Sequence, residues 1–241
     1  MKLFIISGAS KGLGASLLNL VLDENHLAIS ISRTKNNKHS HHFHIAHDLA
    51  RPKGLDAKLE KALTKIDLKK IKAVHLINNA AVIEPIGEVE NFQLEEMEKH
   101  LKVNLLTPMS LCSWVLRTFD KKMPITIVNI SSGAAFHPII NWSLYCGTKS
   151  GLKMFTDCLG VDYQTRKNFR AFSFSPGVMD TNMQATIRKQ TKKTFKNIER
   201  FKQLKQKNEL LSPDKVAMGL YSLIQSPKNI TETHYDIRNL L

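Results

Sequence analysis

The sequence has few cysteines and no long apolar run. It contains three cysteines in 241 residues, an odd number whose spacing fits neither a disulfide framework nor a zinc site. No segment approaches the roughly 20 apolar residues of a membrane-spanning helix, and the apolar run at residues 2–7 is too short for a signal peptide. We therefore expect a protein of the reducing cytoplasm, without a membrane anchor. The cysteines are Cys112, Cys146 and Cys158.

Acidic residues are scarce relative to basic ones. The chain has 21 Asp and Glu residues against 35 Lys and Arg residues, which gives a formal net charge of +14. Much of the excess lies between residues 188 and 207, where Glu199 is the only acid. Such a segment could be solvated, recruit an anionic partner or bind nucleic acid. Its apolar residues approximate helical spacing and are expected to face the protein body, so we favour a solvated segment. The apolar residues are Ile187, Phe195, Ile198, Phe201 and Leu204.

Five histidines lie close together near residue 43, and clustered histidines can bind metal. Histidine and apolar residues alternate from His42 to Ile45, a strand-like pattern that divides the possible ligands between two faces. No cysteine or carboxylate cluster completes a site. We therefore expect no metal ion. The histidines are His39, His41, His42, His44 and His47.

Apolar runs alternate with helical patterns along the whole chain, without a linker or an internal repeat. This alternation predicts a single α/β domain over residues 1–241, built on a parallel sheet. Seven strands are predicted, at residues 2–7, 28–32, 42–47, 73–78, 124–131, 169–175 and 233–237. The main predicted helices span residues 12–24, 55–66, 93–118, 143–163 and 213–225.

A glycine-rich turn follows the first predicted strand at once and leads into a helical pattern. It reads Gly8-Ala9-Ser10-Lys11-Gly12-Leu13-Gly14. Glycines permit a tight turn and close backbone approach, and the N-terminus of the following helix attracts phosphate. A strand, a glycine turn and a helix in this order predict the phosphate-binding start of a dinucleotide fold.

Tyr145 and Lys149 stand four residues apart in a predicted helix, and Ser132 lies 13 residues before the tyrosine. Positions four apart share a helix face, so the ammonium can lie beside the phenol. A nearby ammonium favours the phenolate, and we expect it to lower the tyrosine pKa from about 10 to about 7, which takes about 4 kcal/mol. The pair is interpreted as a general acid/base, and Ser132 as the hydroxyl that orients a carbonyl.

These two motifs, in this order, resemble the short-chain dehydrogenase/reductase family, and the resemblance extends from Leu3 to about Ile237. It implies a doubly wound Rossmann-type α/β domain, in which helices flank a seven-stranded parallel sheet. Further family segments occur after the other strands, with Ala81 in place of a family glycine. The catalytic residues that the resemblance implies are Ser132, Tyr145, Lys149 and Asn104, the last in a water-linked proton relay.

The resemblance also implies a set of cofactor-binding residues along the carboxyl ends of the predicted strands. At the end of the second strand stands Arg33, and no acid lies beside it. NAD-binding proteins usually place an acid there, whereas an arginine accommodates the 2′-phosphate of NADP, so we expect NADP(H). The set comprises Gly8, Ser10, Lys11, Gly12, Leu13, Gly14, Arg33, Asp48, Leu49, Asn79, Ala80, Ala81, Tyr145, Lys149, Pro176, Gly177, Val178 and Thr181.

Within the family, residues 130–135, 177–184 and 210–213 are most similar to bacterial benzil reductases and the sepiapterin-reductase-like group. The resemblance implies an NADPH-dependent carbonyl reductase acting on a ketone, such as a 1,2-diketone like benzil or a sepiapterin-like compound. Residues 182–207 would form a basic substrate lid, and the protein would assemble as a homodimer or homotetramer. Candidate apolar walls of the substrate pocket are Phe136, Trp142, Met179 and Met183.

Two other functions stay open. One is a 3-oxoacyl reductase whose basic lid docks an acidic carrier protein. The other is a catalytically silent NADP-sensing regulator that binds an anionic partner, although the intact Ser132, Tyr145 and Lys149 argue against it. The expected partner is a small carbonyl substrate, and neither nucleic acid nor a membrane is expected to bind.

Overall fold

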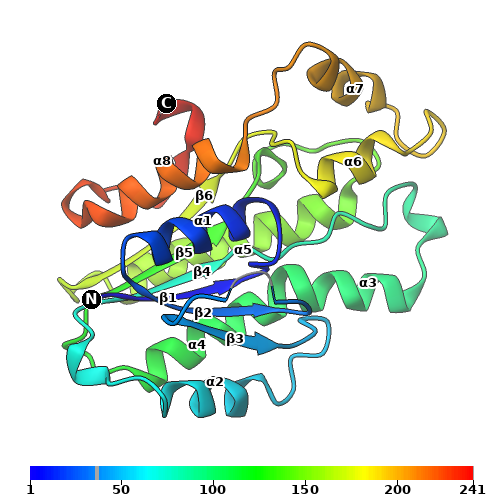
Figure 1. Ribbon diagram of the computed structural model, residues 1–241. Helices are drawn as coiled ribbons and strands as arrows, with labels where there is room; N and C mark the ends of the chain where they lie inside the picture. Colours follow the sequence, from blue (N-terminus) through cyan, green and yellow to red (C-terminus); the bar gives the residue numbers. More distant parts are fainter. Residues whose placement is uncertain (36–37, 241) are drawn as a thin grey trace.

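The computed structural model in Figure 1 describes residues 1–35 and 38–240. Seven strands form one sheet in the order β3-β2-β1-β4-β5-β6-β7, and every neighbouring pair is parallel. The strand order reverses between β1 and β4, the kind of position at which doubly wound sheets bind their ligands. The predicted α/β fold with seven parallel strands is confirmed.

The strands in the middle of the sheet are buried along their whole length. Helices cover both faces there, which is why the strands read as continuous apolar runs instead of alternating patterns. All seven strands lie where the sequence predicts them. They are β1 Leu3–Ser7, β2 Leu27–Ser32, β3 His42–Ala46, β4 Val74–Asn78, β5 Ile125–Ile130, β6 Phe169–Ser175 and β7 His234–Asp236.

Eight α-helices connect and cover these strands in the part of the chain that the structure describes. They are α1 Gly12–Asp23, α2 Leu55–Leu63, α3 Leu94–Leu101, α4 Thr107–Thr118, α5 Ser143–Asp162, α6 Asn182–Arg188, α7 Ile198–Gln206 and α8 Pro213–Gln225. Short 3-10 turns occupy Leu68–Lys70, Val89–Asn91, Gly133–Ala135, Pro227–Asn229 and Ile237–Asn239. Among the described residues, no helix is both long and apolar enough to cross a membrane.

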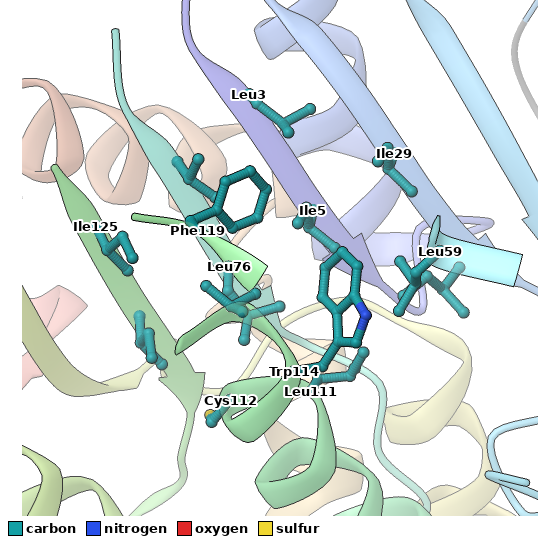
Figure 2. Packing of buried hydrophobic residues seen from close by; sticks show 14 of the residues in the cluster. Leu3, Ile5, Ile29, Leu59, Leu76, Leu111, Cys112, Trp114, Phe119 and Ile125 are labelled. Atoms are coloured by element: carbon teal, nitrogen blue, oxygen red, sulfur yellow. The ribbon is translucent and has the colours of Figure 1, made fainter. Parts of the chain in front are cut away.

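The hydrophobic core has one part on each face of the sheet, beneath the helices that cover that face (Figure 1). α1 and α8 cover one face, where Leu17 and Leu220 are fully buried. α2 and α4 cover the other face, and there Trp114 of α4 packs beside Ile5 and edge-on to Phe119 (Figure 2). Burying a large apolar side chain contributes about 1.5–3 kcal/mol to the stability of the fold. The two helix layers therefore stabilise the sheet that carries the site.

The sequence pattern predicts one helix over residues 93–118, but the structure contains a π-turn within it. α3 runs through this turn, at Lys102–Leu106, directly into α4. A π-turn inserts an extra residue into the helical repeat and frequently lies at a functional site. Here it carries Asn104. The apolar periodicity continues across the turn, so the pattern does not reveal it.

The basic segment at residues 182–207 forms α6 and α7, joined by residues 189–197, beyond the carboxyl end of the sheet (Figure 1). Its apolar residues face inward as predicted, since Phe195 and Ile198 are fully buried and Phe201 is 8% exposed. Its charges lie mostly outward. The exposed basic residues are Lys189, Lys192, Lys193, Lys196, Arg200, Lys205 and Lys207.

Candidate active site

Ser132, Tyr145 and Lys149 meet at the carboxyl end of β5. Ser132 lies just after the strand, and Tyr145 and Lys149 stand one turn apart on α5, only 6% and 2% exposed. The Lys149 Nζ lies 5.7 Å from the Tyr145 ring centroid and donates a 2.8 Å hydrogen bond to the Ile130 carbonyl oxygen. The Ser132 hydroxyl is close enough to the Tyr145 phenol to act on its pKa. The fold therefore brings the three candidates together.

Burial governs the ionisation of both side chains on α5. It raises the pKa of Tyr145 to about 12, although the hydrogen bond with Ser132 acts in the opposite direction. Burial also lowers the pKa of Lys149 to about 8. The prediction of a lowered tyrosine pKa is therefore wrong, because burial disfavours the charged phenolate and is the largest cause acting on this side chain. At neutral pH the phenol holds its proton and can act as an acid.

Asn104 is fully buried in the π-turn and binds the segment that follows β4. Its Oδ1 accepts a 2.8 Å hydrogen bond from the Val82 amide, and its Nδ2 donates one of 2.8 Å to the Val82 carbonyl oxygen. The same Nδ2 lies 2.8 Å from Nε2 of His100. Both hydrogens of the amide are thereby used, so the side chain is held firmly in place.

The glycine turn packs tightly against the end of β4. Gly8 has a φ of +68°, and a Cβ there would lie 2.8 Å from Ala80 Cα. A Cβ at Gly14 would lie 2.5 Å from Nδ2 of Asn79, which itself donates to the Ser7 and Gly8 carbonyl oxygens at 3.0 and 3.1 Å. Such approaches exclude any side chain at either position. A glycine turn that begins a helix at the switch point of the sheet fits a dinucleotide pyrophosphate.

The remaining cofactor candidates lie along the same edge, because each follows the carboxyl end of a parallel strand. A Cβ at Gly12 would lie 3.3 Å from Thr181 Cγ2, so the segment after β6 approaches the glycine turn. Leu49, after β3, is buried, and its carbonyl oxygen accepts a 2.8 Å hydrogen bond from Thr107 Oγ1. Arg33, after β2, is exposed. The candidates after β3, β4 and β6 are Asp48, Leu49, Asn79, Ala80, Ala81, Pro176, Gly177, Val178 and Thr181.

Residues 2–192 match the family model described as short chain dehydrogenase. The chain belongs to the short-chain dehydrogenase family. It is 39% identical over 248 residues to a benzil reductase ((S)-benzoin forming) of Bacillus subtilis, and the match covers 100% of both chains. It is 27% identical over 208 residues to the sepiapterin reductase of Xenopus tropicalis, with 78% of each chain covered. The predicted resemblance to both groups is confirmed.

The solved structures agree on the fold of this short-chain dehydrogenase. The crystal structure of the KRED1-Pglu enzyme has a TM-score of 0.86 at 24% sequence identity, covering 98% of this chain and 100% of that one. Membership of the family makes the protein an oxidoreductase that works with a nicotinamide cofactor.

An aromatic cluster covers Tyr145 on its outer side. The Trp142 ring stacks on Phe195 at 5.1 Å and lies edge-on to Tyr145 at 5.6 Å. Phe201 lies 5.5 Å from both Trp142 and Phe195. Because Phe195 and Phe201 belong to the basic segment, this segment lies directly over the site of the short-chain dehydrogenase.

The structure separates the four candidates for the pocket wall. Trp142 belongs to the aromatic cluster, and the partly buried Met183 packs against the same hydrophobic cluster. Met179 packs instead against the core on the α1 and α8 face of the sheet. Phe136 is 42% exposed, and its ring lies 4.5 Å from that of His234. Phe136 and Met179 therefore lie outside the cluster that covers the site tyrosine.

Sequence reasoning missed His100, Phe195 and Phe201 as residues of the site. The inward direction of the two phenylalanines is predicted, but their contact with Trp142 depends on the path of residues 189–197. His100 precedes Asn104 by four residues, and positions four apart on a helix share a face. That spacing is a signal that could have found the histidine.

The clustered histidines have a structural explanation in the described residues. His42 Nε2 and His44 Nδ1 lie 2.6 and 3.1 Å from Ser30 Oγ, so they tie β3 to β2. Within residues 1–35 and 38–240, no group of three or more histidine, cysteine or acidic side chains is placed to hold a metal ion.

Cys146 is half-buried and lines a hollow of about 390 Å³ between residues 87–90 and 138–143.

Proposed function

We propose that this short-chain dehydrogenase is an NADPH-dependent carbonyl reductase, folded as one domain over residues 1–241 with a substrate lid at residues 182–207. The proposal is carried by the meeting of Ser132, Tyr145 and Lys149 on the sheet edge that also bears the glycine turn. Relatives named benzil reductase and sepiapterin reductase support the reductive direction.

The side chains of the site divide the chemistry among them. Bound NADPH supplies the hydride for the carbonyl carbon. The hydroxyl groups of Ser132 and Tyr145 donate hydrogen bonds to the carbonyl oxygen and stabilise the negative charge that develops on it. Tyr145 then gives its proton to that oxygen, and its raised pKa keeps the phenol protonated beforehand. Lys149 stabilises the phenolate that remains, and Asn104 helps to connect Lys149 with solvent.

The preference for NADPH is supported by the charges near the adenosine end of the site. Arg33 follows β2 and Lys11 lies in the glycine turn, and both are exposed. An arginine fork and a lysine point charge can bind a 2′-phosphate from two sides. No acidic residue adjoins Arg33 to bind the ribose hydroxyls of NADH in its place.

The proposed substrate is a small or aromatic carbonyl compound, above all a 1,2-diketone such as benzil, which becomes a hydroxyketone. The name of the Bacillus subtilis relative supports this class, and a sepiapterin-like compound is the next candidate. A neighbouring carbonyl makes the reacting carbon more electrophilic. The rings of Trp142, Phe195 and Phe201 form an apolar layer beside Tyr145, and an aromatic group packed against this layer would gain about 25 cal/mol per Å² buried.

We also propose that the protein forms a homodimer or homotetramer. Large apolar side chains are exposed on α5, where Met154 and Val161 are 60% and 64% exposed, and on α3, where Leu94 is 62% exposed. Met154 and Val161 lie seven residues apart and so share one face of α5. Apolar side chains gathered on one face favour contact with a second chain.

The test is a panel of carbonyl compounds assayed with NADPH and with NADH. It contains benzil, diacetyl, sepiapterin and a 3-oxoacyl thioester in free and carrier-bound form. We expect the highest kcat/KM for an aromatic 1,2-diketone with NADPH. Equal kcat/KM with NADPH and NADH would contradict the proposed cofactor preference. A protein that turns over none of these carbonyl compounds would contradict the proposed function.

A carrier-linked 3-oxoacyl reductase is the second candidate, favoured by the exposed lysines of the lid. Lys192, Lys193 and Lys196 lie close together in the chain and are open to an acidic carrier protein. This candidate predicts that carrier-bound substrate reacts far faster than any free diketone, and that added salt removes the advantage.

A further inference from the structure

His100 is fully buried at the end of α3, and both of its ring nitrogens have partners. Nδ1 lies 2.7 Å from the Glu84 carbonyl oxygen. Nε2 lies 2.8 Å from Nδ2 of Asn104 and 3.0 Å from Oγ1 of Thr148. One ring therefore joins three parts of the site, namely the segment after β4, the π-turn and α5.

These partners determine which nitrogen of His100 carries the proton. The Glu84 carbonyl oxygen can only accept, so Nδ1 must donate. The Asn104 amide uses one hydrogen on the Val82 carbonyl oxygen and has one left for Nε2, which must therefore keep its lone pair. A proton on Nε2 would place two hydrogen-bond donors, Nε2 and the Asn104 amide, in contact with no acceptor between them. The geometry therefore requires a neutral ring.

The same ring also contacts Tyr145 and Thr148 on α5. It stands edge-on to the Tyr145 ring, with centroids 6.1 Å apart at 88°. Its partner Thr148 adjoins Lys149, and Thr148 Oγ1 lies 3.1 Å from the Tyr145 carbonyl oxygen as well as 3.0 Å from Nε2, so its one hydrogen can be donated to either of these acceptors. Tyr145 and Lys149 are the ionisable side chains that face the ring. Burial is the main cause that lowers the pKa of His100, and the charge of Lys149 adds to it.

We propose that His100 is a positioning residue, whose neutral ring holds the Asn104 amide and keeps the π-turn in register with α5. The inference rests on the proposed function, which assigns proton transfer to Tyr145, Lys149 and Asn104. Small displacements of catalytic groups lower rates strongly even when the substituted residue does not touch the substrate. A ring that only filled space would affect the stability of the fold but not the rate of proton transfer.

Three substitutions separate the functions of the two ring nitrogens. His100→Gln can place an oxygen acceptor near the position of Nε2, His100→Asn keeps a donor near Nδ1 only, and His100→Leu keeps neither. We expect kcat to fall on the order of ten- to hundredfold in the Asn and Leu variants, with KM for NADPH changed less than about twofold. The Gln variant should retain most of the wild-type kcat.

Thermal unfolding and a matched variant separate positioning from stability. His75 is another buried histidine, 4% exposed on β4 and outside the site, so His75→Leu should leave kcat unchanged. The inference holds if kcat depends on whether residue 100 offers an acceptor near the position of Nε2, so that it is high for Gln and low for Asn and Leu, while Tm does not show the same order. Wild-type kcat in the Asn variant, or a loss of kcat that merely parallels the loss of Tm, would overturn it.

Nitrogen-15 NMR of His100 in the full chain supplies a readout that needs no substrate. We expect a protonated Nδ1 and an unprotonated Nε2 that stay unchanged across the pH range of the assay. A ring that titrates in that range would overturn the inference while leaving the proposed function intact. A wild-type protein that reduces no carbonyl at all would overturn both, whereas an active wild type with an equally active His100→Asn overturns this inference alone.

Discussion

Tyr145 and Lys149 are both removed from water, and each side chain is pushed towards its uncharged form. Sequence reasoning treats the lysine as a charged neighbour and so expects a lowered phenol pKa. In the structure the ammonium is itself made less stable by burial, while its Nζ donates to the Ile130 carbonyl oxygen. A phenol that holds its proton at neutral pH suits the reduction of a carbonyl, which ends with protonation of an alkoxide.

Substitution of Tyr145 tests this reading of its ionisation. Tyr145→Phe keeps the ring but removes the proton donor, so turnover should be lost while NADPH binding remains. The difference in phenolate absorbance between wild type and Tyr145→Phe should appear only above the ordinary tyrosine pKa of about 10, because burial raises the pKa of Tyr145 to about 12. Ionisation of this tyrosine below pH 10, or near-normal turnover of the folded variant, would contradict the assignment.

Arg33 is the residue on which the cofactor preference should depend most. Loss of one hydrogen bond to a charged group costs roughly 1.5–3 kcal/mol, so Arg33→Ala should raise KM for NADPH by at least about tenfold. NADH lacks the 2′-phosphate and serves as the internal control, since its kinetics should hardly change. Parallel losses with both cofactors would show that Arg33 supports the fold of the site and not the choice of cofactor.

At the scale of elements, the basic segment at residues 182–207 and the start of α5 form one aromatic unit. Phe195 is fully buried although it belongs to a segment rich in exposed charge. It stacks on Trp142, whose ring in turn contacts Tyr145. The surroundings of Tyr145 are therefore built from two elements that lie far apart in sequence.

Removal of the Phe195 ring should weaken aromatic substrates selectively. Phe195 holds the Trp142 ring by stacking, and aromatic pairs contribute roughly 0.5–1.5 kcal/mol beyond the burial of area, so Phe195→Ala should loosen the Trp142 ring and raise KM for benzil by about three- to tenfold. Diacetyl, which has no ring, should be affected less. Phe136→Ala is the matched control, because Phe136 lies against His234 and outside the cluster. An equal effect of the two substitutions would argue against an aromatic pocket under the lid.

β4 carries a histidine that should make the fold sensitive to acid. His75 is 4% exposed, its ring lies 4.6 Å from that of Phe4, and burial lowers its pKa to about 3. The unfolded chain takes up a proton near the ordinary pKa of about 6.5, but the folded chain does so only near 3. This histidine therefore does not lower the free energy of unfolding above about pH 6.5. Below that pH the free energy of unfolding decreases by up to about 1.4 kcal/mol per pH unit.

Urea unfolding at several pH values measures this effect directly. Between pH 7 and pH 5, the wild-type midpoint should fall further than that of His75→Leu, which has no ring to protonate. Above pH 7 the two midpoints should run parallel. Equal slopes below pH 6.5 would mean that other groups cause the loss of stability in acid.

At the scale of the whole molecule, the exposed apolar face of α5 should hold chains together. Met154→Glu and Val161→Glu each place a charge on this face, where the native residues are 60% and 64% exposed. Burying an unpaired carboxylate is costly, so light scattering should show a smaller assembly for both variants. Leu68→Glu is the control, since Leu68 is 40% exposed in a turn far along the chain from α5. An unchanged mass for all three variants would place the contact elsewhere.

The sequence by itself determined the elements, their order and the residues with chemistry. Buried parallel strands need continuous apolar runs, and the glycine turn needs residues without Cβ, so local patterns were enough to identify them. Ser132, Tyr145 and Lys149 could be selected before the fold was known, because the chemistry of an acid and its neighbours restricts the choice of residue types. The predicted sheet and family are accordingly confirmed.

Only the tertiary structure decided the environments of those residues. The raised pKa of Tyr145, the link from His100 to Asn104, and the cover formed by Phe195 and Phe201 all depend on which distant segments meet. Periodicity assigns a residue to an inner or outer face, but it does not say which neighbour lies there. Burial and desolvation sum over residues far apart in the chain, and such sums are known only once the chain is folded.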